Sequence, residues 1–248
     1  FDAQAPLMIF QQQLKKLEQE DLTGIFQLES ELLPLLWGMR RQGIRVNLEA
    51  AQTLSGDLKR KEDDLRLSMR HKYGRDVDEW SGQVIASICD TLKIKYPTTE
   101  RGNPSFVSDF LDNSDEEFFE EVAALREINK FRQTFVDDWI FKNQVNGVIH
   151  PQWKQLARDD GGTRTGRLAA SNPNPQQIPA GKFRTTGKPS PVGQAIRALF
   201  IPHTPDFKWQ KNDYSQQEPR ILTHFAAECD FTGAKIARMA YRDNPKMD

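Results

Sequence analysis

Residues 213–218 have the sequence Asp213-Tyr214-Ser215-Gln216-Gln217-Glu218, the most informative stretch of this chain. We expect Asp213 to end a short strand over residues 207–213, and we expect a helix over about residues 218–227. An aspartate at a strand end, with the next residue's carbonyl beside it, offers the oxygen ligands that Mg²⁺ takes together with substrate phosphates. Such an aspartate is more often a turn or cap residue, so its neighbours decide between the two roles.

Glu218 also has a structural alternative. The run Ser215-Gln216-Gln217-Glu218 matches the capping box in which a serine and a glutamate cap a helix reciprocally. Pro219 argues against that register, because proline suits the first helical position, where no N–H is needed. We therefore predict Pro219 at the first helical position and Glu218 at the helix edge, with its side chain facing a ligand.

About fifty residues upstream lies a second informative stretch, Thr165-Gly166-Arg167-Leu168-Ala169-Ala170-Ser171-Asn172-Pro173-Asn174-Pro175-Gln176-Gln177-Ile178-Pro179. After Gly166 the backbone can approach a ligand closely, and the Arg167 fork can reach phosphates or minor-groove acceptors. The amides of Asn174, Gln176 and Gln177 can contact bases or sugars, although Asn-Pro repeats also favour plain turns.

The charge around this stretch is uneven. Residues 151–200 hold eight Lys or Arg, at positions 154, 158, 164, 167, 182, 184, 188 and 197, against acids at 159 and 160 alone, while the whole chain carries a net charge of −1. This local excess suits a polyanion, but a basic loop region without a ligand stays open as an alternative.

Length and composition set broad limits. The chain has 248 residues, of which 38% are hydrophobic, enough for one large domain or two small ones. It has no apolar run long enough for a transmembrane helix and no visible secretory signal, so no membrane partner is expected. Cys89 and Cys229 match no metal-binding spacing, and their small number fits a reducing cytoplasm.

Apolar stripes predict long helices before about residue 145 and a mixed α/β part after it. A helix from about residue 22 should end before Gly43, and the next should begin after an Asn47 cap; joined by a short turn, the two should pack antiparallel. A third helix should open with the acidic stretch Asp109 to Glu121. The stripes, all expected to pack in the core, are Leu28, Leu32, Leu35 and Met39; Leu54, Leu58, Leu65 and Met69; and Phe118, Val122, Leu125, Ile128, Phe131, Phe135 and Trp139.

Three polar residues on the third helix have two interpretations. Lys130, Arg132 and Thr134 either form an ordinary solvated face or contact the phosphate backbone of a duplex.

The two informative stretches, with Ile196-Arg197-Ala198-Leu199-Phe200-Ile201-Pro202 between them, form an ordered set that resembles family A DNA polymerases of the bacterial polymerase I and phage type. The resemblance covers nearly the whole chain. It implies an α+β fold in which residues 22–145 form the helical thumb of a right-hand polymerase and residues 146–248 the first part of its palm. Residues 1–21 would be the tail of an upstream domain, a 3′-5′ exonuclease.

The resemblance also implies residue roles. Asp213 would bind both catalytic Mg²⁺ ions, helped by the Tyr214 carbonyl, and Glu218 would be the steric gate that rejects a ribose 2′-OH. Arg167 would contact the primer end in the minor groove. The remaining residues expected to bind DNA are Asn174, Gln176 and Gln177 at the template–primer, Lys130, Arg132 and Thr134 at duplex phosphates, and Arg197.

The sequence departs from the family pattern in three ways. Residues 208–212 are more polar than the usual strand before the aspartate, and Ala169-Ala170 replaces common hydroxyl residues. The sequence stops at Asp248, before the family's fingers and second catalytic aspartate. We therefore expect template-directed DNA synthesis from primer–template and dNTP as the parent activity, in bacterial or phage-infected cytoplasm, and inactivity of this polypeptide alone.

Completion by a second polypeptide carrying the fingers and remaining palm is one hypothesis. The alternative is a non-catalytic DNA-binding fragment of a split or truncated polymerase. A single-subunit RNA polymerase of related fold is a third, and Glu218 speaks against it because a bulky carboxylate there suits dNTPs.

Overall fold

The computed structural model describes residues 4–156, 162–163, 165–181 and 189–244. The chain divides into two compact units, Phe1–Thr204 and Pro205–Asp248. The helices of the first unit are α1 (Gln4–Gln19), α2 (Thr23–Gln42), α3 (Leu48–Tyr73), α4 (Gly82–Leu92), α5 (Ser108–Asp112), α6 (Glu117–Lys130), the π-helix η1 (Phe131–Phe141), the 3-10 helix η2 (Pro175–Gln177) and α7 (Pro191–Ala198). Its strands are β1 (Ile44–Val46), β2 (Gln144–Val145), β3 (Val148–Ile149), β4 (Gln152–Lys154), β5 (Ala169–Ser171) and β6 (Phe200–Ile201).

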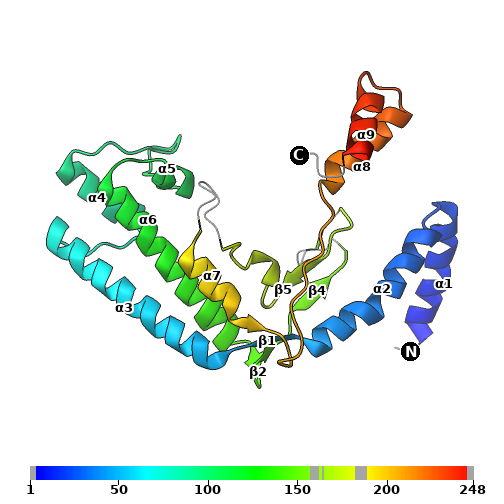
Figure 1. The fold of residues 1–248 in the computed structure, drawn as a ribbon, viewed down its shortest axis with the longest axis horizontal. Coiled ribbons are helices and arrows are strands. Elements are labelled where there is room, and N and C mark those ends of the chain that lie inside the picture. Colours follow the sequence, from blue (N-terminus) through cyan, green and yellow to red (C-terminus); the bar gives the residue numbers. More distant parts are fainter. Residues whose placement is uncertain (1–3, 157–161, 164, 182–188, 245–248) are drawn as a thin grey trace. The chain divides into compact units, whose positions relative to one another are not determined.

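The centre of the first unit is a long helix pair. Helix α3 packs against α6 and its continuation η1, and the three run side by side in Figure 1. Two apolar clusters lie along them. One joins Met69 and the α6 stripe to α4 and α5, and the other joins Leu58 to η1, β1 and α7. The stripes predicted for α3 and for the third helix are therefore confirmed as core.

Short strands connect these helices. The sheet has the order β2-β3-β1-β6, and all its pairs are antiparallel, with Ile44 opposite Ile149 and Val46 opposite Phe200. A separate antiparallel pair, β4 and β5, places Trp153 opposite Ala170. The mixture of dominant helices with short antiparallel strands confirms the α+β class.

Two predicted helix boundaries are confirmed, the end of α2 and the start of α3. Gly43 ends α2 at φ 67°, and a Cβ there would lie 2.5 Å from the Ile149 carbonyl oxygen, so both conformation and space call for glycine. The Asn47 side chain accepts a hydrogen bond of 3.0 Å from the Ala50 backbone N–H, as an N-cap should.

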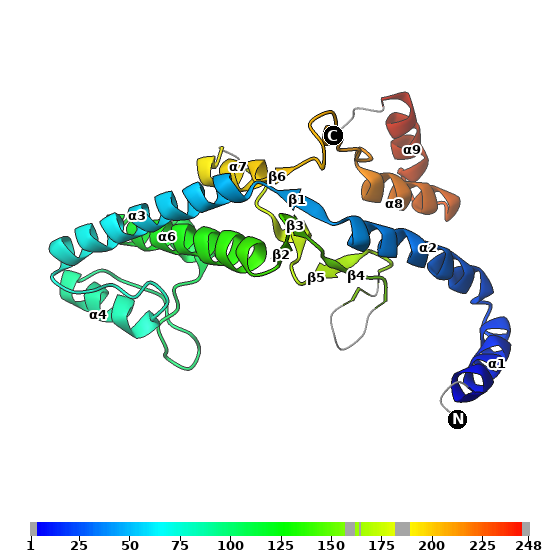
Figure 2. The same cartoon turned by 90° about the horizontal axis from the view of Figure 1, so that it is seen from below.

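The predicted pairing of the first two helices is wrong. Strand β1 separates α2 from α3, and α2 instead contacts β4, as seen in Figure 2. The stripe predicted to be core is largely exposed, with Leu28 at 53%, Leu35 at 58% and Met39 at 38%. Helix periodicity identifies an apolar face but does not identify what covers it, and in α2 only Leu36 is buried among the described residues.

Other boundaries also differ from the prediction. The acidic stretch that was expected to open the third helix contains the short helix α5 and a break, and α6 begins at Glu117. The π-helix η1 and the helices α7 and α9 were not predicted. No strand forms over residues 207–213, where the run Lys208-Trp209-Gln210-Lys211-Asn212 supplies too few apolar residues for a buried strand.

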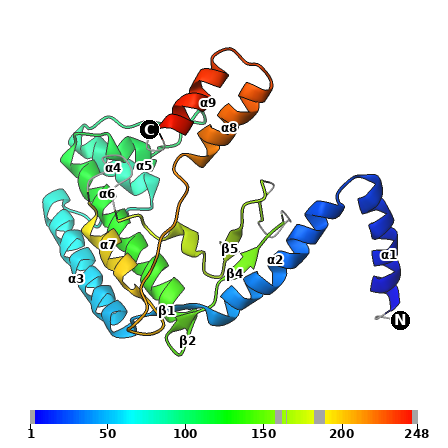
Figure 3. The same ribbon diagram turned by 45° about the vertical axis from the view of Figure 1, so that its right-hand side comes forward.

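The second unit is a helical hairpin of α8 (Gln217–Glu228) and α9 (Ala234–Asp243), visible in Figure 3. The Arg220 guanidinium joins them, because it donates a hydrogen bond of 2.8 Å to the Tyr241 carbonyl and lies 4.9 Å from the centre of the Tyr241 ring. Helix α8 confirms the helix predicted over residues 218–227. Across both units, no described helix is long and apolar enough to cross a membrane.

Candidate functional site

Asp213, Tyr214 and Glu218 lie together at the start of α8 in the second unit. Asp213 and Tyr214 belong to an irregular segment, and both side chains are exposed, Tyr214 by 81%. Arg220 Nε donates a hydrogen bond of 2.9 Å to the Ser215 carbonyl, which fastens this segment to the first turn of the helix. Asp213 is therefore held close to a helix start, although it does not end a strand.

The predicted helix register is shifted. Helix α8 begins at Gln217, so Pro219 is its third residue rather than its first. This position tolerates proline because the first four N–H groups of a helix have no intrahelical acceptor. Gln216 is the N-cap, at φ 50° and without a side-chain capping bond, so the capping box of Ser215 and Glu218 does not form. Glu218 is exposed in the first turn, and its role in facing a ligand stays a prediction.

The donor set at Asp213 fits part of a magnesium site. A carboxylate and the neighbouring Tyr214 carbonyl are hard oxygen ligands, which suit Mg²⁺ when phosphates complete the coordination. Throughout the described part of the chain, no group of three His, Cys, Asp or Glu side chains comes together as a metal site. These residues can supply one carboxylate to such a site.

The second informative stretch forms a turn, a strand and a short helix in the first unit. Gly166 adopts φ 73°, the exposed Arg167 follows it, and the Thr163 hydroxyl donates to the Arg167 carbonyl. Strand β5 then pairs with β4, and the Asn172–Pro173 peptide bond is cis. The chain thus presents Arg167 on an exposed turn before a paired strand.

The amide side chains after β5 make turn contacts. Asn174 caps η2, because its side-chain oxygen accepts a hydrogen bond of 3.0 Å from the Gln176 N–H. Gln176 Nε2 donates to the Leu168 carbonyl at 2.9 Å, and Gln177 is exposed. The turn chemistry considered for Asn174 and Gln176 is therefore present, and contact with DNA by these residues and Gln177 stays a prediction.

Helix α7 is hydrogen-bonded to Pro179, the last residue of the stretch over residues 165–179. Arg197 Nη1 donates a hydrogen bond of 3.1 Å to the Pro179 carbonyl, and Ser190 caps the helix. Lys154, Arg167 and Arg197 are the members of the basic group inside the described residues. Positions 158, 159, 160, 164, 182, 184 and 188 lie outside them.

The three residues proposed to contact duplex phosphates differ in their surroundings. Lys130 is exposed at the end of α6, and Thr134 is half-buried in η1. The Arg132 side chain is only 15% exposed and is engaged by Glu62 Oε2 at 2.9 Å and Asp137 Oδ2 at 2.8 Å. These contacts favour an internal role for Arg132, whereas Lys130 remains available to a ligand.

Sequence reasoning missed the buried carboxylate that holds Arg132. Glu62 is 4% exposed and lies on α3 four residues after Leu58, within the apolar stripe. A charged residue in the register of a buried stripe is itself a signal, because such a residue needs partners.

The candidate residues thus divide between the units. Asp213, Tyr214 and Glu218 belong to the second, and Arg167, Asn174, Gln176, Gln177, Arg197, Lys130, Arg132 and Thr134 belong to the first.

Comparison with known proteins agrees with this pattern of motifs. The profile of the family described as DNA polymerase family A matches residues 48–236. A DNA-directed DNA polymerase of Pseudomonas phage M6 is 32% identical over 264 aligned residues, which cover 100% of this chain and 38% of the relative. A DNA polymerase I of Rhizobium leguminosarum is 29% identical and is matched over 91% of this chain and 22% of its own length.

A solved structure shares the fold. It is described as the POL domain of Pol1 from M. smegmatis in complex with DNA primer–template and dNTP, and it aligns with a TM-score of 0.67 at 24% identity, covering 86% of this chain and 36% of that one. The chain spans about two fifths of the phage relative and about a fifth of the Rhizobium one. Because the family profile matches well over half of its residues, this chain belongs to DNA polymerase family A.

Proposed function

We propose that this chain forms the thumb and the first part of the palm of a template-directed DNA polymerase. The observation that carries the proposal is the placement of Asp213 and Tyr214 beside the first turn of α8, with Glu218 exposed in that turn. We assign residues 22–145 to the thumb, residues 146–248 to the palm and residues 1–21 to the tail of an upstream exonuclease domain. The α3–α6–η1 helix group supports the thumb assignment.

In this proposal Asp213 and the Tyr214 carbonyl hold Mg²⁺, which supplies charge neutralisation at the transferring phosphate. Glu218 occupies the space that a ribose 2′-OH would need and so favours dNTPs. Arg167, Asn174, Gln176, Gln177 and Arg197 position the primer–template, and Lys130 contacts duplex phosphate. Catalysis of phosphoryl transfer depends mainly on positioning of the reactants and on compensation of their charge by the protein.

Two assays test this function. A chimera in which residues 1–248 replace the matching part of the phage M6 polymerase should extend a primer. The isolated 248-residue polypeptide should bind primer–template but not extend it. The carboxylate of Asp213 cannot by itself complete a site for two metal ions. A well-folded chimera that binds DNA and never extends it would favour the alternative, a non-catalytic DNA-binding fragment.

Glu218→Ala should relax sugar discrimination. Removing the carboxylate opens space beside the sugar, so we expect the ratio of dNTP to rNTP incorporation by the chimera to fall by at least about tenfold, which is 1.4 kcal/mol of discrimination. Single-nucleotide incorporation kinetics measure kcat/KM for each sugar. Glu228→Ala, at the other end of α8, is the control, and an unchanged ratio in Glu218→Ala would refute the gate.

Lys130→Ala should weaken DNA binding in a salt-dependent way. Each phosphate contact contributes about 0.9 to the slope of log K against log salt, so losing one contact should flatten the slope by about that amount. Fluorescence anisotropy of labelled duplex at several salt concentrations gives the slope. Lys61→Ala, which removes an exposed lysine from α3, is the matched control. Equal slopes for Lys130→Ala and the unmodified chain would place Lys130 outside the DNA contact.

A further inference from the structure

The turn between α2 and β1 is held by two histidines from distant parts of the first unit. His150 Nδ1 lies 2.8 Å from the carbonyl oxygen of Arg40, in the last turn of α2. His203 Nε2 lies 3.2 Å from the carbonyl oxygen of Gly43, the residue that follows the helix. Because a backbone carbonyl can only accept, both ring nitrogens carry a hydrogen and donate. The histidines therefore satisfy carbonyl groups at the end of a helix, where such groups lack intrahelical partners.

His203 also fastens the strand that follows this turn. Its backbone carbonyl accepts a hydrogen bond of 3.0 Å from Arg45 Nη1, and Arg45 lies opposite Ile201, the last residue of β6. Gly43 leaves room for the other ring, because a Cβ on Gly43 would lie 2.7 Å from His150 Nδ1. The two histidines thus connect the end of α2 to the residues that follow β3 and β6, the two neighbours of β1.

Helix α2 depends on such polar anchors because little of it is buried. Among its described residues only Leu36 is buried, and its apolar stripe is largely exposed. A second attachment comes from Gln155, whose Nε2 donates to the Glu29 carbonyl at 2.9 Å and to the Glu29 carboxylate at 2.6 Å. Gln155 follows β4 directly, so α2 is attached to the sheet at its end and to β4 along its length (Figure 3).

The ribbon of β4 and β5 depends on α2 in the same way. Each strand has three residues, and a two-stranded ribbon of this length is at most marginally stable in water without a packing partner. Helix α2 contacts β4, and η2 contacts β5. Arg167 lies on the exposed turn that leads into β5, so the position of Arg167 depends on the support of this ribbon.

We propose that His150 and His203 are positioning residues, which fasten the last turn of α2 to the sheet and thereby hold the β4–β5 ribbon in place. The consequence for DNA, that Arg167 is presented to primer–template in one position, rests on the function proposed above. Neither histidine contacts DNA in this proposal. Both act through backbone carbonyls at the end of α2, and α2 transmits the constraint to β4 through Gln155 and Glu29.

Paired substitutions separate loss of the hydrogen bond from loss of the ring. His150→Ala and His203→Ala remove both. His150→Asn and His203→Gln keep an amide N–H donor at about the distance of Nδ1 and of Nε2, respectively, so each should restore the contact. His71→Ala, which removes an exposed histidine from the last turn of α3, is the matched control and should behave as the unmodified chain.

The first readout is amide hydrogen exchange of the 248-residue chain, which requires no activity. We expect the amides of β4 and β5 to exchange about five- to tenfold faster in His150→Ala and in His203→Ala, because loss of one supporting hydrogen bond raises the population of the opened ribbon by about that factor. The amides in the middle of α6 should keep their rates, which shows that the first unit stays folded. His150→Asn and His203→Gln should restore slow exchange.

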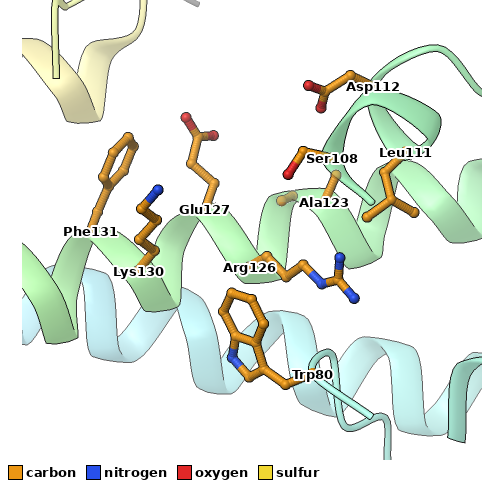
Figure 4. A pocket seen from close by; sticks show the side chains of 10 residues that line it. Trp80, Ser108, Leu111, Asp112, Ala123, Arg126, Glu127, Lys130 and Phe131 are labelled. Carbon is orange, nitrogen blue, oxygen red and sulfur yellow. The ribbon is translucent and has the colours of Figure 1, made fainter. Parts of the chain in front are cut away.

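The second readout is affinity for labelled primer–template, measured by fluorescence anisotropy. A ribbon that is in place about a third of the time binds about threefold more weakly, so His150→Ala should lower the affinity by about that factor. The loss should vanish when Arg167 is already alanine, because His150 acts through Arg167. It should instead add to the loss in Lys130→Ala, since Lys130 lies on α6 beside Glu127 and Phe131 rather than on the ribbon (Figure 4).

Three results would overturn the proposal. They are unchanged exchange of the β4 and β5 amides in both alanine variants, failure of both amide variants to restore slow exchange, and a loss of affinity in His150→Ala that persists in full on top of Arg167→Ala. Faster exchange in the alanine variants, combined with an unmodified chain that does not bind primer–template, would contradict the function proposed above and still support the positioning of the ribbon.

Discussion

Asp213→Ala should reduce primer extension by the chimera by about a thousandfold or more while leaving primer–template affinity nearly unchanged. A catalytic metal contributes several kcal/mol to stabilising the transferring phosphate, and each 1.4 kcal/mol corresponds to a factor of ten in rate. DNA affinity comes mainly from phosphate contacts by basic residues, and Asp213 makes none of these. Single-turnover extension measures the rate, and anisotropy of labelled primer–template measures the affinity.

A matched control lies in the same irregular segment. Asp206 is exposed like Asp213, so Asp206→Ala removes one carboxylate at a similar level of exposure and should retain normal extension. Broadening of backbone signals near residue 213 by Mn²⁺ gives a readout besides activity, and Asp213→Ala should abolish that broadening. Turnover by Asp213→Ala at the unmodified rate would remove this residue from the metal site.

Local sequence signals predicted the helices around the core well. Asn47 and Gly43 set their boundaries through hydrogen bonds and backbone angles that involve only nearby residues, and both were predicted. The apolar face of α2 shows the limit of such reasoning. Its leucines recur at helical spacing, yet burial depends on which distant segment packs there, and periodicity carries no information about that partner.

The π-helix was not predictable from the apolar stripe. Phe131, Phe135 and Trp139 recur with α-helical spacing, and the first two are buried as predicted. The wider hydrogen-bond pattern of η1 coincides with contacts to a distant helix, because Arg132 pairs with Glu62 and Asp137 accepts a hydrogen bond from Ser55, both on α3. π-helical hydrogen bonding is rare in proteins, so α-helical spacing of apolar residues favours an ordinary α-helix in this segment.

For the candidate site, the motifs predicted which residues lie beside the start of α8 but not the backbone conformation of the segment before it. Asp213 and Glu218 are exposed beside a helix start as expected, whereas the strand predicted before Asp213 is absent because residues 208–212 are polar. For Arg132 the sequence leaves two interpretations open, a solvated helical face or a contact with duplex phosphate, and both place its side chain at the surface. Its true surroundings depend on Glu62, seventy residues away, which no local pattern connects to it.

Glu62 is the centre of a buried ionic network that joins α3, α6 and η1. One carboxylate oxygen accepts from Arg132 Nε at 3.0 Å, and the other accepts from Asn129 at 3.2 Å and from Arg66 Nη2 at 3.3 Å. Arg66 also pairs with Glu79 at 2.7 Å, and Glu79 is 1% exposed. Removing Glu62 would therefore leave two arginine side chains without a shared counterion inside the helix group.

Glu62→Gln should lower the free energy of unfolding of the first unit by about 3 kcal/mol, the lower end of the cost of breaking a buried ion pair. For a unit of this size that corresponds to a fall in Tm of about 6–12 °C. Thermal and urea unfolding followed by circular dichroism measure both quantities. Asp64→Asn, which neutralises an exposed carboxylate on the same helix, should change stability by less than about 0.5 kcal/mol.

The pH dependence and a double mutant give this prediction a second test. Burial alone would raise the pKa of the Glu62 carboxyl, but hydrogen bonds from Arg132 and Asn129 hold that pKa below its ordinary value of 4.5. Because the folded-state pKa is the lower one, the stabilisation is complete above pH 4.5 and is lost as pH falls through the folded-state value. Glu62→Gln should therefore lack this acid-sensitive component.

Combining Glu62→Gln with Arg132→Gln should lower the free energy of unfolding by less than the sum of the two single changes, since each removes the same ion pair. Strict additivity, together with a flatter salt slope of DNA binding in a folded Arg132→Gln variant, would instead assign Arg132 to duplex phosphate.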